Sequence, residues 1–452
     1  MMNLFFYRSD RMFDYSVIQF IQNHAHQLDK PLQVEILNLY KRFKRAPKFL
    51  QNRLGPLFMH TIKLSVIVEF EDMECQKQSV QQLQHSLTTN AHCQFKNQFS
   101  SVPCCSVDVT LAALADLFKS HSTIRKVHLN RQVQALLDHA IPSVQADHVV
   151  RNNKQLTGQG ITIAIIDTGV YPHSDLEGRI VDFVDFINRR SAPYDDNGHG
   201  THCAGAAAGN GAASGGTYKG AAPKANIIGV KALDRLGAGS LETVMQGVEW
   251  CIEYNRNHPN NPIHVISLSL GSPPQRFKEE NADPMVQVVE RAWQSGIVVC
   301  AAAGNSGPRD RTITSPGISN EIITVGALDD RNTQHTRQDD VAADFSSRGP
   351  TPYGETKPDL LAPGVNIISL RAPNSYLDRS QSSRRVHPSY FSLSGTSMAT
   401  PICAGIVALM LEHHPHLAPN EVKEKLKNGT VQWKDINSNL YGSGYINAEN
   451  SI

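Results

Sequence analysis

Four short segments in the second half of the chain are strongly apolar, and they limit its possible folds more than any other feature. They are residues 161–166, 264–270, 296–302 and 321–326. A half-exposed strand alternates apolar and polar residues, whereas strands of a parallel sheet are covered on both faces and lack that alternation. Because segments rich in small residues lie between them, we predict an α/β fold with a mainly parallel central sheet. The polar segment 371–390 is predicted as a mobile surface loop.

The first 140 or so residues differ in composition from the rest. They are rich in Gln, His and Lys, whereas Gly, Ala, Ser and Val are frequent afterwards. Residues 64–70 predict a strand, and residues 76–87 and 111–121 predict helices. We therefore predict three parts: an N-terminal extension of unknown role (1–60), a small α+β domain (61–140) and a large α/β domain (141–452).

The charge balance bears on the class of partner. Lys and Arg number 43 against 42 Asp and Glu, which leaves a formal net charge of +1. Nucleic acid and anionic membranes are bound by strongly basic surfaces, so we expect neither as a partner. Eight cysteines occur, but those of the first part lack the paired spacing of a zinc site, so no metal site is predicted there.

The N-terminal sequence and the apolar segments bear on location. The apolar stretch in Met-Met-Asn-Leu-Phe-Phe-Tyr-Arg is too short and too soon interrupted by charge for a secretory signal. No apolar run reaches the roughly 18 residues that a membrane-spanning helix needs. We therefore expect a cytoplasmic protein without a membrane partner.

Asp167 follows the first of the buried strands and precedes Thr168-Gly169. A carboxylate at the carboxyl end of a parallel strand lies where open α/β sheets bind their ligands. Asp-Thr-Gly is also typical of aspartic proteases, but that mechanism needs two carboxylates that share a proton, and no second Asp-Thr-Gly occurs in the chain.

Two histidines, His199 and His202, lie three residues apart at the start of a predicted helix of small residues. Glycines flank His199 on both sides, which permits close approach of another segment. We therefore predict His199 as the general base and His202 as a packed structural neighbour. A zinc site is disfavoured because the pair lacks the Glu of a His-Glu-x-x-His helix.

Ser397 lies where a loop enters a long predicted helix, in Gly395-Thr-Ser-Met-Ala-Thr-Pro401. The free N–H groups and positive potential of a helix N-terminus favour an anion beside a nucleophile there. A plain N-cap would explain Ser397 equally well from this segment alone. Asn305, in Ala301-Ala-Ala-Gly-Asn-Ser-Gly307 at the end of another strand, can donate its amide N–H to an oxyanion.

Together the motifs around Asp167, His199 and Ser397 resemble the three active-site signatures of the subtilases. The resemblance covers about residues 140–450. Within the family, the sequence is similar in particular to the intracellular AprX-like branch. The resemblance implies a subtilisin-like three-layer fold and a serine endopeptidase. By this resemblance Ser397 is the nucleophile, His199 the base, Asp167 the residue that orients the base, and Asn305 an oxyanion donor. No cofactor is required for that chemistry.

The resemblance also implies where a polypeptide substrate lies. It would pair as an added strand with two enzyme segments and place its side chain before the cleaved bond (P1) in an uncharged pocket. We therefore expect broad specificity with an apolar or aromatic P1 residue. The residues implied in substrate binding are Gly237, Ala238, Gly239, Ser269, Leu270, Gly271, Ala303, Gly304 and Thr314.

Three further features follow from the same resemblance. Asp175 matches a calcium-ligating position, although the segment 209–220 brings no carboxylate, so structural calcium is possible and unproven. Cys203 resembles the free cysteine of proteinase K-like members, which can be sensitive to mercurials, although packing explains it as well. The part before residue 140 resembles a propeptide that assists folding and inhibits the enzyme, with self-cleavage expected within residues 135–142.

Two other function classes stay open at this point. A silent subtilase fold could serve as a binding or chaperone-like protein, but all four chemical positions are intact. An esterase or acyltransferase could use the same nucleophile, since acyl-enzymes also form from esters. The sequence favours peptide hydrolysis.

Overall fold

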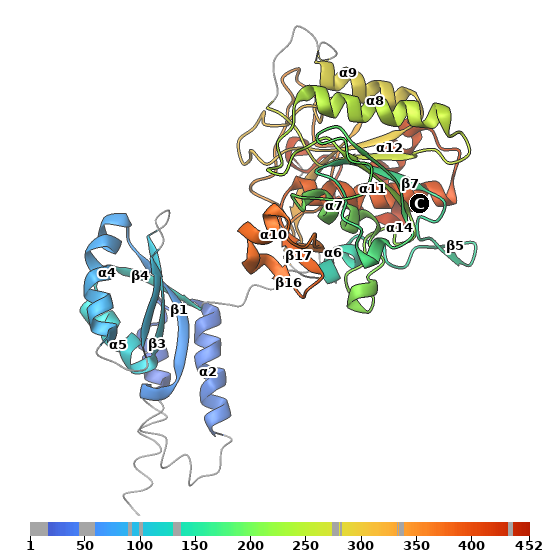
Figure 1. Cartoon of the computed structure of the whole chain (residues 1–452). Helices are drawn as coiled ribbons and strands as arrows, with labels where there is room; N and C mark the ends of the chain where they lie inside the picture. Colours follow the sequence, from blue (N-terminus) through green and yellow to red (C-terminus); the bar gives the residue numbers. More distant parts are fainter. Residues whose placement is uncertain are drawn as a thin grey trace, which may run out of the picture. The chain divides into compact units, whose positions relative to one another are not determined.

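The computed structural model divides the chain into two compact units, residues 1–133 and 134–452 (Figure 1). Each unit is described by itself. The described residues are 17–44, 59–88, 93–98, 103–129, 137–273, 280, 283–331, 333, 339–432 and 437–452.

The N-terminal unit contains a four-stranded antiparallel sheet in the order β2-β3-β1-β4. In the central strand, Leu64, Val66, Val68 and Phe70 are buried and alternate with more exposed residues, as expected for a sheet with one face toward the core. The predicted strand and both predicted helices are confirmed. The elements are β1 (Lys63–Phe70), α4 (Met73–Thr88), β2 (Gln94–Gln98), β3 (Cys104–Thr110), α5 (Leu111–Ser120) and β4 (Ile124–Leu129).

Helix α2 (Lys30–Lys44) belongs to the same unit. It packs along the edge strand β4, and Leu28 just before it forms a bridge with Val127. Leu32 and Ile36 of α2 lie in one hydrophobic core with the sheet. The predicted boundary at residue 60 therefore does not separate the described part of residues 1–60 from the unit.

The C-terminal unit is built on an eight-stranded sheet in the order β13-β12-β11-β10-β7-β9-β8, with β14 paired to β12. All pairings are parallel except that of β13. The four predicted strands are β7, β10, β11 and β12, which are buried almost throughout, and the predicted fold class is confirmed. The strands are β7 (Thr162–Asp167), β8 (Ile180–Asp185), β9 (Asn226–Lys231), β10 (Val265–Leu268), β11 (Val298–Ala302), β12 (Ile323–Asp329), β13 (Val341–Ala342) and β14 (Leu360–Pro363).

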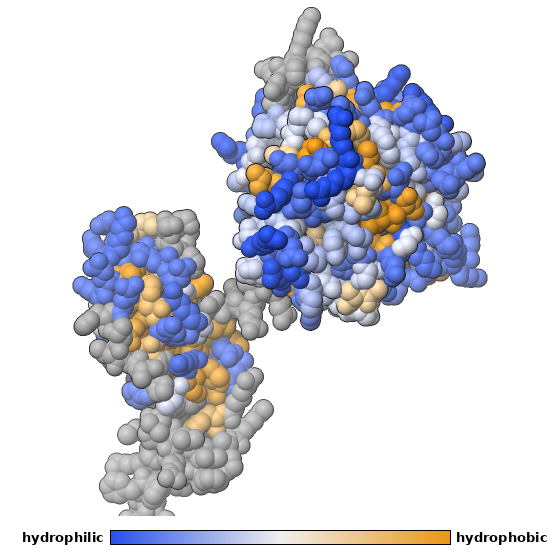
Figure 2. All heavy atoms as spheres, viewed as in Figure 1, coloured by the Kyte–Doolittle hydropathy of each residue, from blue (hydrophilic) through white to orange (hydrophobic). Residues whose placement is uncertain are grey.

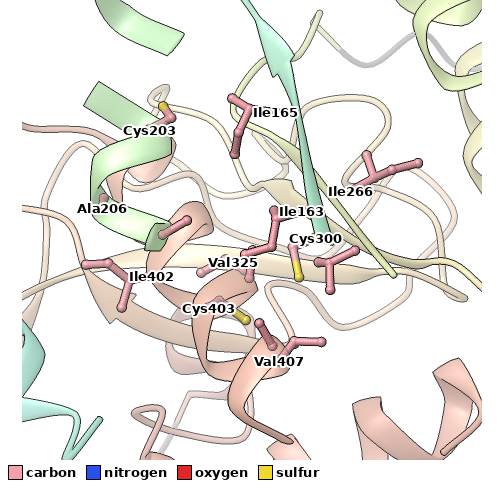
Figure 3. Close-up of a cluster of buried hydrophobic side chains, with 14 of the residues drawn as sticks. Ile163, Ile165, Cys203, Ala206, Ile266, Cys300, Val325, Ile402, Cys403 and Val407 are labelled. Atoms are coloured by element: carbon pink, nitrogen blue, oxygen red, sulfur yellow. The ribbon is translucent and has the colours of Figure 1, made fainter. Parts of the chain in front are cut away.

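Helices cover both faces of this sheet (Figure 1). Helices α7 (His199–Ala208) and α11 (Thr396–His413) pack against each other on one face, and α8 (Leu241–Asn257) and α9 (Pro284–Gln294) lie on the other. Figure 3 shows Ile402, Cys403 and Val407 of α11 in the core that also holds side chains of the strands. The face of the unit in Figure 2 is mainly hydrophilic.

Helix α11 is the one helix in the described part of the chain with the length and apolar character of a membrane span. Its buried share is 83%, however, so it is the core helix of this unit. The remaining elements are β5 (Val150–Arg151), β6 (Lys154–Gln155), α6 (Leu137–Ser143), β15 (Ile367–Leu370), β17 (Tyr390–Leu393), α12 (Pro419–Asn428), α13 (Ser438–Tyr441), α14 (Ala448–Ser451) and three short 3-10 turns (Ser174–Leu176, Ala212–Ser214, Ser382–Arg384).

The segment 371–390, predicted as a mobile loop, forms ordered structure instead. It contains α10 (Tyr376–Ser380) and β16 (Arg385–Val386), which pairs with β17. Asp378 is only 2% exposed and accepts from Arg371 Nε at 2.5 Å and Arg385 Nε at 2.6 Å. A carboxylate buried between two guanidinium groups holds the segment together, and the polar composition of the segment gave no sign of this internal pairing.

The strand order places a binding edge at the carboxyl ends of β7 and β10. From β7 the chain builds β8 and β9 on one side, and then crosses to add β10, β11 and β12 on the other. Such a reversal opens a crevice at the carboxyl ends of the strands. Asp167 ends β7, Ser269 follows β10, and Asn305 follows β11 by three residues.

Candidate active site

Asp167 and His199 form a polar pair at this edge. The Asp167 side chain is fully buried, and His199 Nδ1 lies 2.8 Å and 2.9 Å from its two oxygens. An ionised carboxylate can only accept, so Nδ1 carries the proton and Nε2 stays free to act as a base. His199 starts α7, and the absence of a side chain on Gly200 lets this helix approach the carbonyl of Gly169.

The electrostatics of His199 follow from this pair. Burial by itself lowers the pKa of the imidazole, but the charge of Asp167 and its hydrogen bond outweigh burial and hold the pKa well above the ordinary 6.5. The carboxylate therefore stabilises the imidazolium that forms when His199 takes up a proton.

Asp195 fixes the turn that delivers His199, and sequence reasoning did not single it out. Its Oδ1 accepts from the Thr168 hydroxyl at 2.9 Å and from the N–H of Gly198 at 2.8 Å. Its Oδ2 accepts from the N–H and the hydroxyl of Thr201, at 2.9 Å and 2.6 Å. Asp195 thus ties the start of α7 to the residue that follows Asp167.

Ser397 is the second residue of α11 and faces the end of β10. Its hydroxyl donates to the Ser269 carbonyl at 3.1 Å, and the Ser269 hydroxyl donates to the Ser397 carbonyl at 2.7 Å. Cys203 Sγ lies 3.8 Å from His199 Nδ1 and 3.5 Å from the Ser397 carbonyl oxygen. The buried thiol therefore touches both the helix of the base and the helix of the nucleophile.

The orientation of Asn305 is set by Thr396, the residue before Ser397. Asn305 Oδ1 accepts from the Thr396 N–H at 2.9 Å and from the Thr396 hydroxyl at 3.1 Å. Because the N–H can only donate, the amide oxygen must face Thr396, and the Asn305 NH₂ group faces the other way. An NH₂ group held beside a helix N-terminus can stabilise an oxyanion.

A cleft of about 660 Å³ runs between two chain segments beside His199. One wall includes Gly237, Ala238 and Gly239, and the other includes Ser269, Leu270 and Gly271, so the predicted substrate segments lie together. The Ala238 N–H is already bonded to Asp234 Oδ1 at 3.0 Å, and its carbonyl accepts from the Asp234 N–H at 2.7 Å. The main-chain groups of Ala238 are therefore occupied, and the Gly237 N–H is also bonded, to the Asp234 carbonyl at 3.0 Å.

A second pocket of about 430 Å³ adjoins Ser397 and Asn305 and includes Gly271, Gly304 and Thr314. A Cβ on Gly271 would lie 2.6 Å from Thr314 Oγ1, and a Cβ on Gly304 would lie 2.5 Å from Thr314 Cγ2. Thr314 thus fills the space between the two walls. The glycines leave room for it.

Two details of this pocket differ from the sequence-based prediction. Ala303, which was implied in substrate binding, is fully buried in a small core with Ile313, whereas its neighbours Ala302 and Gly304 line the pocket. Successive residues leaving a strand point to opposite faces, which the sequence alone did not assign. The predicted pocket also carried no charge, whereas the exposed Arg311 is among its lining residues.

Comparison with known proteins agrees with this geometry. The sequence profile of the subtilase family matches residues 158–444. This chain is a subtilase. It is 55% identical over 441 residues to serine protease AprX of Bacillus subtilis (strain 168), covering 98% of this chain and 99% of that protein. It is 32% identical to a thermostable alkaline protease of Halalkalibacterium halodurans, covering 78% and 84%.

Solved structures give the same result for the fold. A structure described as S41 psychrophilic protease is 29% identical with a TM-score of 0.55 and covers 68% of this chain and 97% of its own. A cold-adapted subtilisin-like serine proteinase is 28% identical with a TM-score of 0.51, covering 70% and 97%.

The segment 371–390 adds a wall to the cleft of this subtilase. The N–H groups of Tyr376 and Leu377 donate to the carbonyls of Asp196 and Asn197, at 2.8 Å and 2.9 Å. Leu377 lines the cleft near His199. Sequence reasoning missed this contact because nothing in the local sequence indicates which distant segment a short helix will touch.

Asp175, which matches a calcium-ligating position, is engaged by hydrogen bonds in this subtilase. Its Oδ1 accepts from the Ala213 N–H and its Oδ2 from the Tyr390 hydroxyl, both at 2.8 Å. Arg179 donates to the carbonyls of Ala208 at 2.7 Å, Ala225 at 2.8 Å and Asp175. Hydrogen-bond donors thus occupy both carboxylate oxygens, and the Arg179 guanidinium occupies three main-chain carbonyls.

The ligand atoms of Asp167, His199 and Cys203 lie within 4.8 Å of one another, a spacing that could hold a metal ion. The Asp167 oxygens and His199 Nδ1, however, are joined by their own hydrogen bond. Burial also raises the pKa of Cys203, which opposes the thiolate that a metal would need. Subtilases need no cofactor for catalysis.

His202 lies in the core as the sequence suggested. It is fully buried, and its Nε2 lies 3.0 Å and 3.1 Å from the carbonyls of Ile367 and Phe391. Burial lowers the pKa of His202 to about 3, which keeps the ring neutral. It joins α7 to β15 and β17.

Proposed function

We propose that this serine protease is a broadly specific endopeptidase that cleaves peptide bonds in proteins through an acyl-enzyme. The observation that carries the proposal is the bidentate contact of His199 Nδ1 with the buried Asp167, at 2.8 Å and 2.9 Å. An imidazole oriented in this way, in the same site as a serine at a helix N-terminus, is the arrangement that acyl transfer needs.

In the proposed reaction the Ser397 oxygen attacks the scissile carbonyl while its proton passes to His199 Nε2. The resulting oxyanion accepts hydrogen bonds from the Asn305 NH₂ group and from the Ser397 N–H. The C–N bond then breaks, and the proton on Nε2 passes to the leaving amine. Water attacks the acyl carbon with the same base, the Ser397 oxygen recovers its proton, and the acid product leaves.

The proposed substrate is an extended polypeptide that lies along the 660 Å³ cleft and pairs with Gly237, Gly239 and the segment 269–271. In the part of the chain that the structure describes, the main-chain groups of Leu270 and Gly271 have no hydrogen-bond partner. We propose an apolar or aromatic P1 residue in the pocket beside Thr314, because Leu270, Ala302 and glycine backbone form much of its wall.

We further propose that the N-terminal unit acts as a propeptide that inhibits the peptidase unit and assists its folding. The expected cleavage lies within residues 135–142. Helix α6 begins at Leu137, and Ala140 and Ile141 are buried in the peptidase core, so a cut that leaves this core intact falls before Leu137. Residues 130–136 are outside the described residues.

The test compares wild type with Ser397→Ala. Wild type should react with a serine-directed fluorophosphonate, hydrolyse casein and shorten its own N-terminus, and the variant should do none of these. An enzyme that is labelled but leaves casein intact would be an esterase and would contradict the proposal. The cytoplasmic location is likewise a proposal, and finding casein hydrolysis mainly in the supernatant of unlysed cells would contradict it.

A further inference from the structure

We propose that Arg311 allows the P1 pocket to accept a glutamate side chain in addition to apolar ones. This inference rests on the proposed endopeptidase function and specifies its substrate class. Among the residues that the structure describes, the pocket of about 430 Å³ beside Ser397 has one charged lining residue, Arg311. All its other lining residues are apolar, glycine or neutral polar.

The backbone of Arg311 is held in place. It has φ 60°, and its N–H donates to the Gly349 carbonyl at 3.1 Å. The next residue, Thr312, exchanges two hydrogen bonds with Arg348, at 2.9 Å and 3.0 Å. A residue anchored on both sides presents its side chain from a fixed point on the rim, so the ordering cost of meeting a ligand falls mainly on the side chain.

The guanidinium of Arg311 is available for a ligand. The residue is exposed, and its side chain forms no ion pair with any residue that the structure describes. By contrast, Arg371 and Arg385 are both engaged by Asp378. A planar guanidinium can donate two parallel hydrogen bonds to a carboxylate, which makes it a selective partner for an acidic side chain.

A P1 side chain in this pocket would share it with both Thr314 and Arg311. Thr314 occupies the space between Gly271 and Gly304, as the close approach of a Cβ on either glycine shows. A glutamate has two methylene groups that can lie along Leu270 and Ala302, while its carboxylate points back toward the mouth. The apolar walls thus serve both classes of side chain, and Arg311 separates glutamate from its neutral isostere glutamine.

The test uses the purified enzyme and two tetrapeptide p-nitroanilides that differ only in Glu or Gln at P1. The measured quantity is the ratio of kcat/KM for Glu to that for Gln. Replacing Arg311 by Gln should lower this ratio roughly two- to fivefold, as expected for one exposed ion pair. High salt should lower the wild-type ratio in the same direction.

Arg309→Gln is the matched control, because Arg309 is an exposed arginine of the same segment that does not line the pocket. It should keep the wild-type ratio. Arg311→Glu should invert the preference, so that Lys at P1 is cleaved faster relative to Gln than in wild type. Fluorophosphonate labelling of each variant shows that its active site is formed.

An unchanged Glu to Gln ratio in the labelled Arg311→Gln enzyme, or an equal fall in Arg309→Gln, would overturn the inference while the endopeptidase proposal stands. Failure of wild type to cleave a Leu peptide and to be labelled would instead overturn the endopeptidase proposal, and the inference with it.

Discussion

Replacing Asp359 by Asn should strongly destabilise the peptidase unit. Asp359 Oδ2 lies 2.6 Å from Lys357 Nζ, and its Oδ1 lies 3.2 Å from Lys423 Nζ. The side chain of Asp359 is 8% exposed, that of Lys357 1% and that of Lys423 10%. Asp359 precedes β14, which pairs with β12, so the cluster holds the sheet next to β11, the strand that Asn305 follows by three residues.

The magnitude follows from the burial of both lysines. Lys423 also donates to the carbonyls of Asn320 and Ile322, at 2.6 Å and 2.9 Å, whereas Lys357 has only the Ile322 carbonyl at 3.2 Å besides Asp359. Removing one member of a buried ion pair typically costs about 3–5 kcal/mol, because the other charge is left uncompensated. We expect the free energy of unfolding to fall by that amount near neutral pH.

The pH dependence gives the sign of the effect. Burial lowers the pKa of Lys357 to about 8 from the ordinary 10.5, even though Asp359 opposes the shift. Between these two values the unfolded chain binds a proton that the folded chain has released, so this group makes wild type more stable as pH rises. Above pH 8 Lys357 becomes neutral in the folded state, and the difference between wild type and Asp359→Asn should shrink.

The assay is urea unfolding followed by tryptophan fluorescence, with every variant in the Ser397→Ala background to prevent autolysis. Glu424→Gln is the exposed control, since it breaks a surface pair with Lys427 and should cost less than about 1 kcal/mol. Adding Lys357→Met to Asp359→Asn removes the stranded charge and should recover much of the loss. A loss no larger than that of Glu424→Gln, or one that grows with pH, would refute the reasoning.

Three further outcomes are expected. Because Asp167 holds the pKa of His199 above 6.5, kcat/KM of wild type should rise with pH through that raised value. Asp167→Asn should shift the rise to lower pH and reduce kcat about 10⁴-fold. An unshifted pH profile of the variant would contradict this. Thr396→Val removes one of the two hydrogen bonds that orient Asn305 and should lower kcat about tenfold with little change in KM. An effect on KM alone would show that the Thr396 hydroxyl does not act through the oxyanion site. Arg179→Met should lower the free energy of unfolding by about 2–3 kcal/mol, and calcium should not restore it; rescue by calcium would contradict the cation-like role of the guanidinium.

The sequence predicted the central sheet well because its signal is local. Segments such as 161–166 and 296–302 are apolar along their whole length, which occurs when a strand is covered on both faces, and they became β7 and β11. The prediction of the N-terminal unit from the sequence was less complete. The pattern of β1 predicted its strand, but packing of α2 along β4 depends on residues about 90 positions apart, which no local pattern encodes.

The site divides in the same way. Glycines beside His199 and a serine at a helix start are local signals, and the structure places these residues at one edge of the sheet. Whether Ala302 or Ala303 lines the pocket depends on which face of the chain turns toward it after β11. The presence of Arg311 at the same pocket depends on a loop anchored to Arg348 and Gly349. Asp175 kept the sequence position of a calcium ligand, but tertiary neighbours had already filled its hydrogen bonds.

By itself the sequence determined the class of fold, the family, and the residues with the chemistry of acyl transfer, because each is recorded in a short contiguous pattern. Only the tertiary structure decided the neighbours of those residues. These are Thr396, which orients Asn305, the segment 371–390 beside His199, and the charged Arg311 in the pocket lining. The physical reason is that hydrogen bonds and charges act over a few ångströms in space, and strand register and helix packing bring residues from distant segments within that range.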